Sequence, residues 1–263
     1  MKIFIPTYKR EWKQHTLNGI PNGWINKTFL VCPKDEMHNW PNRIDVPEEC
    51  IGSVSKTRQW IIEQSDDPHV AMLDDDLTFY KRDDVIKTSR STSPGIVNDM
   101  FNLMNDWLDQ GDVFCGTSNS FMSHEKPSEY YYGKPSHCCF LNRDYLNQHN
   151  IRYDDITYFE DFHVPLAIME SGKRLHYSGE YISVEKKANA EGGCSVNRTK
   201  ENNRDAMIQL QKMHPNWVTL KEDESAVNQN LQVGLKMRIE FKKLYDEKVM
   251  GNKTKAEYGS LFD

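Results

Sequence analysis

Three consecutive aspartates, Asp74, Asp75 and Asp76, directly follow the apolar run at residues 70–73. Ionised carboxylates this close together repel one another, and their charge is costly unless a cation or hydrogen-bond donors offset it. Oxygen ligands of this kind suit Mg²⁺ or Mn²⁺, which often bridge to substrate phosphates. The triplet therefore predicts a divalent-cation site, and the alternative is a solvated acidic turn or helix cap.

A second acidic pair, Glu160 and Asp161, opens a helix predicted over residues 159–171. The helix dipole alone favours acidic residues in a first turn, so the pair has a purely structural explanation. The functional alternative is a general base at the mouth of a cleft.

Polar, basic and aromatic side chains occur just after the first predicted strand and on the helix that follows the second. Thr7, Tyr8, Lys9 and Arg10 follow the first predicted strand, and Ser55, Lys56 and Arg58 lie on the next helix. Arginine and lysine can bind phosphate, and tyrosine can stack on a base. The histidines at 137, 163 and 176 are candidate ligands, with His176 the best placed because it lies on an apparent strand after the acidic helix.

The first half of the chain alternates strands and helices. Short apolar runs predict strands at residues 2–6, 28–31 and 70–73, and helical spacing predicts helices at 53–64 and 94–108. This order predicts an α/β sandwich with a mostly parallel sheet, in which ligands sit beyond the carboxyl ends of the strands. The loop at residues 6–8 and the aspartate triplet should therefore meet at one edge.

The second half is more irregular. Residues 117–137 are rich in Ser, Tyr, Pro and Gly and are interpreted as a substrate-facing loop. The three consecutive tyrosines at 130–132 could stack on bases or sugars, or could equally form a partly buried strand. A helix is predicted over 202–213. Strict apolar alternation predicts one strand over 231–241, with residues 218–220 as its partner.

Composition limits the class of protein. The 263 residues are 38% apolar with a mean hydropathy of -0.75, and the sequence has no apolar run long enough for a spanning helix or signal peptide. The six cysteines form no C-x-x-C pair, so we expect reduced thiols and a cytoplasmic protein. The net charge of -6 argues against a nucleic-acid binder, but residues 234–255 hold seven basic and three acidic residues, which is compatible with a DNA-binding face or with a solvated end.

Taken in order, these segments resemble a known family. Residues 3–10 (IFIPTYKR) resemble the opening strand and Pro-Thr-x-x-Arg loop of GT-A-fold glycosyltransferases, and residues 73–76 (LDDD) resemble their Asp-x-Asp motif. Residues 159–161 (FED), followed by Gly172, resemble their Glu-Asp motif on the acceptor side. More narrowly, the chain resembles the bacteriophage TET-associated glycosyltransferases, which act on hydroxymethylated bases in DNA.

The resemblance implies a GT-A-like (Rossmann-like) α/β fold, with a mixed sheet flanked by helices. One domain would span residues 1–263, with a nucleotide-sugar-binding half (1–115), an acceptor and catalytic half (116–200) and a C-terminal β/α extension (201–263). The implied activity is metal-dependent transfer of a hexose or pentose from a nucleotide-diphosphate donor, expected to be a UDP-sugar, to 5-hydroxymethylcytosine in phage DNA. The alternatives are a polysaccharide or protein acceptor, or a non-catalytic module that binds nucleotide or metal. We expect no membrane association, and the cytoplasm would be that of the infected host.

The resemblance also implies residue roles. Asp76 would be the principal ligand of Mn²⁺ or Mg²⁺, Asp74 would face the ribose and the metal, and His176 is a candidate third ligand. Asp161 would be the catalytic base if the enzyme inverts, and Glu160 would contact the acceptor. The donor-binding residues would be Pro6, Thr7, Tyr8, Arg10, Lys56, Arg58, Asp74 and Asp75. Residues 191–194 would form a lid that excludes water.

Overall fold

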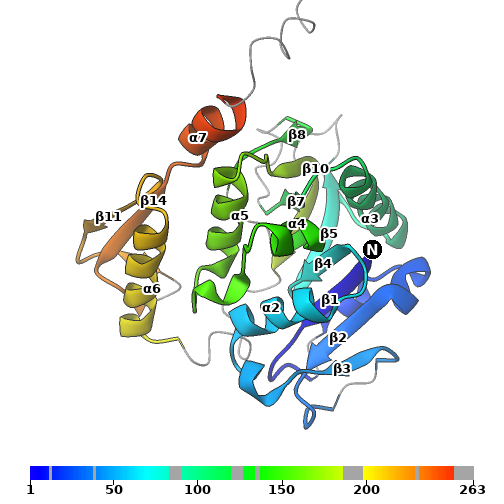
Figure 1. The fold of residues 1–263 in the computed structure, drawn as a ribbon. Coiled ribbons are helices and arrows are strands. Elements are labelled where there is room, and N and C mark those ends of the chain that lie inside the picture. Colours follow the sequence, from blue (N-terminus) through cyan, green and yellow to red (C-terminus); the bar gives the residue numbers. More distant parts are fainter. Residues whose placement is uncertain are drawn as a thin grey trace, which may run out of the picture.

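A ten-stranded sheet forms the centre of the protein in the computed structural model, which describes residues 1–11, 14–37, 40–82, 90–119, 127–133, 137–185, 198–228 and 231–251. Its strands lie in the order β3-β2-β1-β4-β9-β7-β10-β5-β6, and β8 pairs with β10 (Figure 1). The strands are β1 Lys2–Pro6, β2 Thr28–Cys32, β3 Arg43–Asp45, β4 His69–Leu73, β5 Leu77–Arg82, β6 Arg90–Ser91, β7 Phe114–Ser118, β8 Glu129–Tyr130, β9 Cys138–Asn142 and β10 His176–Glu185.

The sheet is mixed, which confirms the GT-A-like expectation and corrects the mostly parallel sheet predicted from alternation. β1 runs parallel to both β2 and β4. β9, however, lies between β4 and β7 and is antiparallel to both of them, and β5 is antiparallel to β10. Because β9 is antiparallel, its N-terminal end lies at the same edge of the sheet as the carboxyl ends of β1 and β4.

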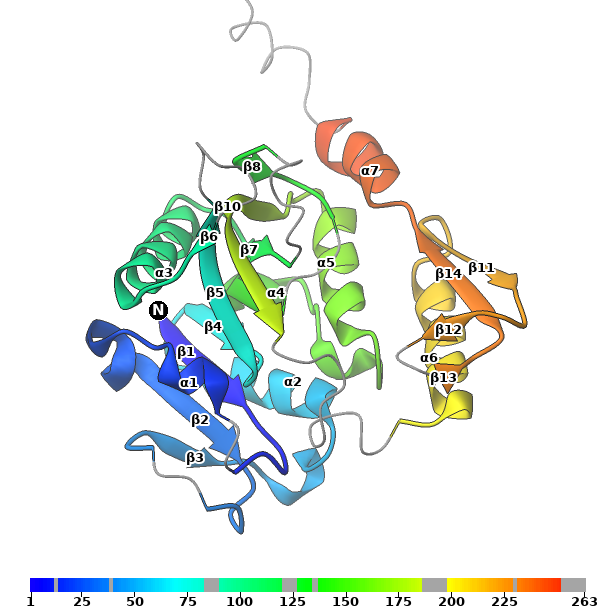
Figure 2. The same ribbon diagram turned by 180° about the vertical axis from the view of Figure 1, so that it is seen from behind.

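Helices cover both faces of the sheet, as Figures 1 and 2 show. The α-helices are α1 His15–Asn18, α2 Val54–Gln64, α3 Pro94–Asp109, α4 Arg143–Gln148, α5 Glu160–Glu170, α6 Lys200–Met213 and α7 Phe241–Leu244. The 3₁₀-helices are η1 Asn22–Lys27, η2 Glu48–Cys50 and η4 Tyr153–Asp155, and η6 Tyr245–Met250 is a π-helix. The helices predicted at 53–64, 94–108, 159–171 and 202–213 correspond to α2, α3, α5 and α6.

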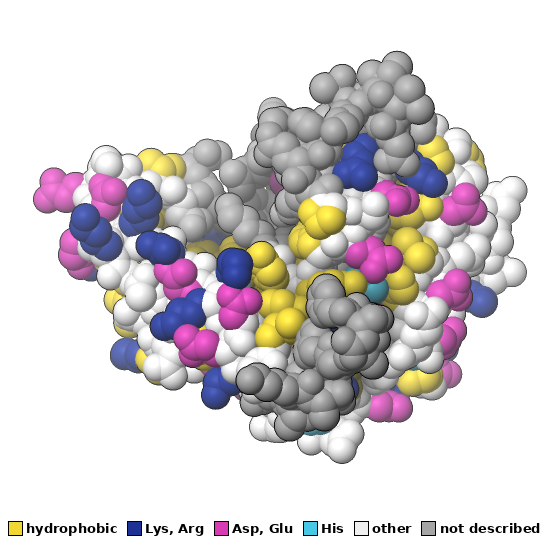
Figure 3. Space-filling model, turned by 90° about the horizontal axis from the view of Figure 1, so that it is seen from above, with side chains coloured by type: hydrophobic (Ala, Val, Ile, Leu, Met, Phe, Trp, Pro, Cys, Tyr) yellow, Lys and Arg dark blue, Asp and Glu magenta, His cyan; other side chains and the backbone are white. Residues whose placement is uncertain are grey.

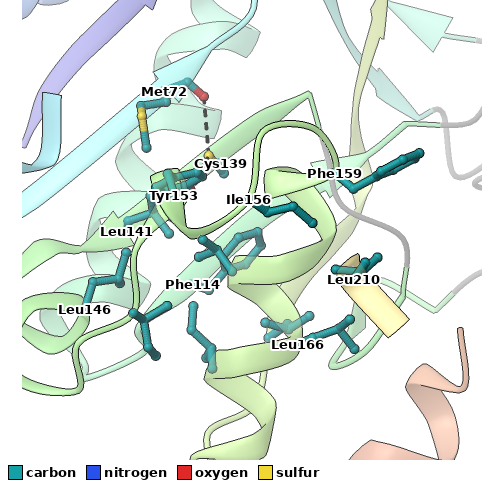
Figure 4. Close-up of a cluster of buried hydrophobic side chains, with 14 of the residues drawn as sticks. Met72, Phe114, Cys139, Leu141, Leu146, Tyr153, Ile156, Phe159, Leu166 and Leu210 are labelled. Atoms are coloured by element: carbon teal, nitrogen blue, oxygen red, sulfur yellow. Dashed lines mark hydrogen bonds between the residues drawn. The ribbon is translucent and has the colours of Figure 1, made fainter. Parts of the chain in front are cut away.

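Alternation along the central strands divides the core into two clusters. In β1, Phe4 joins the cluster beneath α2, α4, α5 and α6, whereas Ile3 and Ile5 join the one beneath α1 and α3. Such alternation is what a strand with both faces buried requires. Figure 4 shows the first cluster, in which Leu166 of α5 and Leu210 of α6 lie close together.

The ends of two predicted helices are fixed by their own side chains. Ser53 caps α2 by accepting a hydrogen bond from the backbone N–H of Lys56, and Ser93 caps α3, which begins with Pro94. Both are standard helix starts in which a side-chain oxygen satisfies a backbone donor.

Residues 198–251 form what we call the C-terminal unit, in which β11 Val218–Glu222 pairs with β14 Leu235–Ile239, and β12 Val227–Asn228 with β13 Leu231–Gln232. The single strand predicted over 231–241 is wrong in one respect. Gly234 has a φ of 71°, which breaks the run into β13 and β14, and Phe241 begins α7. In the part of the chain that the structure describes, no helix has the length and apolarity needed to cross a bilayer. The proposed boundaries within the domain stay predictions.

Candidate active site

A cavity of about 480 Å³ lies at the edge of the sheet where β1, β4 and β10 end and β9 begins. This volume is in the range of ligand-binding pockets. The lining combines the loop after β1, the turn before α2, the aspartate triplet, the first turn of α5 and two residues of the C-terminal unit. The polar lining side chains are those of Thr7, Tyr8, Arg10, Ser53, Thr57, Arg58, Asp74, Asp75, Asp76, His137, Glu160, Asp161, Glu185, Arg198 and Asn228.

The structure thus brings together most of the predicted site residues, including Pro6, which also lines the cavity. Lys56 is exposed on α2 and is not among the lining residues. The segment at 191–194 lies outside the described residues, so its predicted role as a lid stays a prediction.

Thr16 fixes the backbone of the aspartate triplet. Its hydroxyl donates to the carbonyl oxygen of Asp74 and accepts from the backbone N–H of Leu77, while its own N–H donates to the carbonyl oxygen of Asp75. These bonds hold the turn between β4 and β5, so the three carboxylates project into the cavity rather than into solvent.

Arg10 joins the second and third carboxylates of the triplet. One guanidinium nitrogen, Nη1, contacts Asp75 and lies 2.8 Å from Oδ2 of Asp76. The hydroxyl of Thr7 donates to the other oxygen of Asp75. Burial raises the pKa of Asp75 to about 6 despite the opposing charge of Arg10. The loop after β1 is therefore attached to the triplet by charge and by hydrogen bonding.

Arg58 connects the triplet to the acidic helix. From α2 its guanidinium donates to Oδ1 of Asp74 at 2.8 Å and to Oε1 of Glu160 at 3.1 Å. The side chain is buried, so these charge-assisted bonds are little screened by water. Residues 58, 74 and 160 thus form one connected network across three elements.

The first turn of α5 places two adjacent carboxylates in the cavity. Phe159, just before the helix, has a left-handed backbone (φ 65°), a conformation that costs free energy for a non-glycine residue. Burial raises the pKa of Glu160 to about 7, against the opposing charge of Arg58. Burial also raises the pKa of Asp161. Among the described residues, the Asp161 carboxylate has no hydrogen-bond or ion-pair partner, so it is available to accept a proton.

Asp74, His137 and Glu185 form a cluster whose ligand atoms all lie within 4.8 Å of one another. The Nδ1 atom of His137 is 3.1 Å from Oε1 of Glu185 and 3.6 Å from Oδ2 of Asp74. Burial opposes protonation of His137, but the two carboxylates raise its pKa to about 9. Contacts with His137 and Arg58 outweigh burial and lower the pKa of Asp74.

This donor set fits a divalent cation. Two carboxylate oxygens and one imidazole nitrogen are ligands that would suit Mn²⁺. Asp76 lies in the same cavity beside Arg10, and its predicted role as principal ligand stays a prediction.

The structure places His176 away from this cluster. His176 begins β10 and Glu185 ends it, so the two residues lie at opposite ends of the strand. Its Nδ1 contacts Asp112 at 2.6 Å, its Nε2 contacts Glu129 at 3.1 Å, and its ring stacks on Trp107. Both ring nitrogens thus contact carboxylates that do not line the cavity, and the histidine of the cluster is His137.

Sequence reasoning did not single out Glu185, Arg198 or Asn228, and it left His137 as one of three weak candidates. Glu185 is the last residue of β10, and the aspartate triplet comes directly after β4. A prediction of β10 over its full length would therefore have indicated Glu185 as a site residue. Arg198 and Asn228 come from the C-terminal unit, and no local pattern indicates that they reach the cavity.

Comparison with solved structures agrees with the fold. Staphylococcus aureus TarS 1-349 in complex with UDP-GlcNAc is 11% identical with a TM-score of 0.50, covering 82% of this chain and 67% of that one. The mannosyltransferase PcManGT from Pyrobaculum calidifontis, in complex with GDP-Man and Mn²⁺, is 11% identical with a TM-score of 0.51, covering 81% and 63%. The chain thus spans about two thirds of the length of these proteins. Among curated proteins, none matches the sequence.

The family comparison is more specific. The model of the TET-associated glycosyltransferases matches residues 1–193, which include the loop after β1, the aspartate triplet, His137, the acidic turn of α5 and Glu185. A match over this part of the chain excludes the alternative of a non-catalytic binding module. The carboxylate-rich cavity is therefore the candidate active site, and the chain belongs to the TET-associated glycosyltransferase family.

Proposed function

We propose that this enzyme uses Mn²⁺ or Mg²⁺ to transfer a sugar from a UDP-sugar to the hydroxyl group of 5-hydroxymethylcytosine in DNA. One observation carries the proposal. Asp161, a half-buried carboxylate with no hydrogen-bond or ion-pair partner in the described parts of the chain, shares one cavity with the Asp74–His137–Glu185 cluster. A glycosyl transfer needs both features, since a proton must be removed from the acceptor and a negatively charged diphosphate must leave.

Two features support a nucleotide-sugar donor bound together with a divalent cation: the carboxylates that line the cavity and the fold shared with two solved structures. PcManGT was solved with GDP-Man and Mn²⁺, and TarS with UDP-GlcNAc, on the same fold. A cavity lined by six carboxylates repels a diphosphate, so a divalent cation has to bind with it. Asp74, His137 and Glu185 would hold that cation, and its chemical contribution is to stabilise the charge that develops on the leaving diphosphate.

The residues of the chain then have distinct tasks. The oxygen of the acceptor hydroxyl attacks the anomeric carbon, its proton passes to a carboxylate oxygen of Asp161, and the bond from the anomeric carbon to the phosphate oxygen breaks, releasing UDP. Burial raises the pKa of Asp161 and so makes it a stronger base than an exposed aspartate. Arg58 holds Glu160 and Asp74 in fixed positions on either side. In this scheme the anomeric configuration inverts.

The DNA acceptor is proposed from the family and from the C-terminal unit. Phe241, which begins α7, stacks near the cavity-lining Phe162 with ring centroids 6.4 Å apart. The exposed Lys242 and Lys243 follow it on α7. Basic side chains of this kind bind phosphates without regard to sequence. A DNA acceptor also places the reaction in the cytoplasm, that of the infected cell if the chain is phage-encoded.

The charge of this surface is mixed rather than uniformly basic. Figure 3 shows Lys and Arg side chains of the C-terminal unit interleaved with acidic ones. Arg238 pairs with Glu240, and Lys242 pairs with Asp246. Such pairs reduce the local positive charge, so we expect weak, salt-sensitive DNA binding, with most selectivity coming from recognition of the hydroxymethylated base in the cavity.

A panel of nucleotide sugars tests the proposal. The protein is incubated with each donor, Mn²⁺ and hydroxymethylated or plain DNA, and the nucleosides are analysed by mass spectrometry. We expect a hexose or pentose mass on hydroxymethylcytosine only. Asp161→Asn should reduce transfer by about 10² to 10⁴-fold, because it removes the base, and Asp76→Ala should also abolish transfer if Asp76 is a metal ligand.

Asp144→Asn is the matched control, because Asp144 is an exposed aspartate on α4 that does not line the cavity. It should transfer sugar at the wild-type rate. No mass shift on DNA with any donor would refute the DNA acceptor, and full activity of Asp161→Asn would refute the assignment of the base. Transfer to a polysaccharide or protein instead would retain the glycosyltransferase and replace the acceptor.

A further inference from the structure

We propose that Arg198, in the C-terminal unit, binds a phosphate group of the substrate in the active-site cavity. This inference rests on the proposed function and adds a residue to it. Arg198 lies beyond residues 1–193, the part of the chain that the family model matches, yet it lines the same cavity as the aspartate triplet. The C-terminal unit therefore supplies part of the substrate-binding surface.

Arg198 is held in place before any ligand binds. Its guanidinium lies over the ring of Tyr158, 4.9 Å from the ring centroid. The next residue, Thr199, caps α6, and its side chain and that of Asn202 form a reciprocal capping box. Asn202 also donates to the hydroxyl of Tyr158 at 3.3 Å. The cation is thus fixed by a stacked aromatic ring and a capped helix, which lowers the entropy lost on binding a ligand.

The other cations in the cavity are neutralised by carboxylates. Arg10 contacts Asp75 and Asp76, Arg58 contacts Asp74 and Glu160, and His137 lies between Asp74 and Glu185.

Arg198 differs from these three. Within the described parts of the chain, it makes no ion pair or hydrogen bond through its guanidinium, and its buried Nε has no partner. An arginine left unpaired beside several carboxylates indicates that its partner is a ligand rather than a protein group.

The chemistry of the guanidinium identifies the class of ligand. Its planar fork of N–H donors matches two phosphate oxygens, and it keeps its charge at any physiological pH. The contact with Tyr158, just before α5, places Arg198 on the α5 side of the cavity. A phosphate bound there could belong to the diphosphate of the donor or to the DNA strand next to the flipped base.

Binding measurements separate these two sources. We would measure UDP, GDP and uridine binding by calorimetry in the presence of Mn²⁺, and binding of a hydroxymethylated duplex by fluorescence anisotropy. The variants are Arg198→Gln, Arg198→Lys and the control Arg204→Gln. Arg204 lies on α6, the helix that follows Arg198, pairs with Glu222 and does not line the cavity.

If the phosphate is that of the donor, Arg198→Gln weakens nucleoside diphosphate binding by about 10- to 100-fold, as expected for loss of charge-assisted hydrogen bonds, and leaves uridine binding unchanged. If it is that of the acceptor, the same loss appears with DNA and the salt dependence of binding decreases. In either case Arg198→Lys should retain part of the affinity, and Arg204→Gln should bind like the wild type.

Wild-type affinity of Arg198→Gln for both the diphosphates and DNA would overturn this inference and leave the proposed function intact. Wild-type protein that binds neither nucleoside diphosphate nor DNA would instead refute the proposed function together with the inference. Circular dichroism of each variant checks that the fold is retained, and since Arg198 makes no ion pair within the described chain, its replacement should not unfold the protein.

Discussion

Glu160→Gln should stabilise this protein at pH 8 and have little effect at pH 5. Glu160 is buried beside Arg58, and burial raises its pKa from an ordinary value of 4.5 to about 7. Between these two pH values the folded protein keeps a proton that the unfolded chain has already released. The free energy of unfolding of the wild type therefore falls as the pH rises through this window and levels off above pH 7.

The size of the effect follows from the shift. Each pKa unit corresponds to about 1.4 kcal/mol, so ionised Glu160 destabilises the folded state by about 3 kcal/mol above pH 7. Glutamine resembles the protonated acid in shape and cannot ionise, so the variant avoids this loss. Arg58 keeps Asp74 as a partner at 2.8 Å and is not left as an isolated charge. We expect a gain of about 3 kcal/mol at pH 8 that shrinks to about 1 kcal/mol or less at pH 5.

Urea unfolding followed by circular dichroism at pH 5, 6, 7 and 8 measures this dependence. Glu49→Gln is the control, because Glu49 is exposed and is not a cavity-lining residue; its difference from the wild type should be small and independent of pH. A Glu160→Gln variant that is no more stable than the wild type at pH 8, or whose gain does not shrink towards pH 5, would refute the reasoning. A confirmed gain would indicate that the carboxylate is retained for activity at a cost in stability.

Three further substitutions test other parts of the structure. His137→Gln should weaken Mn²⁺ binding, followed by electron paramagnetic resonance, by at least about 10-fold, because loss of a direct ligand should cost no less than loss of an outer-shell partner; unchanged binding would exclude the cluster as the metal site. His176→Gln should leave Mn²⁺ binding unchanged but lower the free energy of unfolding by about 1–3 kcal/mol, since the largely buried Asp112 loses a charged hydrogen bond. Weaker Mn²⁺ binding by this variant would indicate that His176 is a metal ligand after all. Gly234→Ala should lower the free energy of unfolding by about 1 kcal/mol, because φ is 71° at this position and an added Cβ would lie 3.4 Å from Nη1 of Arg204. An unchanged free energy of unfolding in a denaturation curve would show that the backbone relaxes there.

The sequence was informative where local pattern and chemistry coincide. An apolar run followed by three aspartates predicts a strand that ends in a carboxylate cluster, and the structure has β4 followed by that cluster at the cavity. The same holds for Glu160 and Asp161 in the first turn of a helix, and for the loop that carries Arg10. In each case a few consecutive residues define both the element and the place where it ends.

The remaining site residues depend on contacts between distant segments. His137 reaches the cavity only because β9 is antiparallel to β4. The residue types at 138–142 do not indicate in which direction this strand runs in the sheet. His176 was preferred because it lies on a strand, but it lies at the amino end of β10, whereas Glu185 of the candidate metal cluster lies at the carboxyl end. Arg198 depends on how the C-terminal unit packs against α5, which no local periodicity encodes.

The position of β9 has a consequence for synthesis of the chain on the ribosome. β4 pairs with β1 on one edge, but its other edge stays open until β9 emerges, because β9 begins more than 60 residues later in the sequence. At a translation rate of about 5–20 residues per second, this apolar strand is unpaired for roughly 3–13 s, long enough for pairing with another nascent chain. The docking of β9 also forms the bond from the backbone N–H of Asp74 to the carbonyl oxygen of His137. A nascent chain arrested before residue 137 would therefore carry the aspartate triplet without its metal site, and an open strand edge for chaperones to cover.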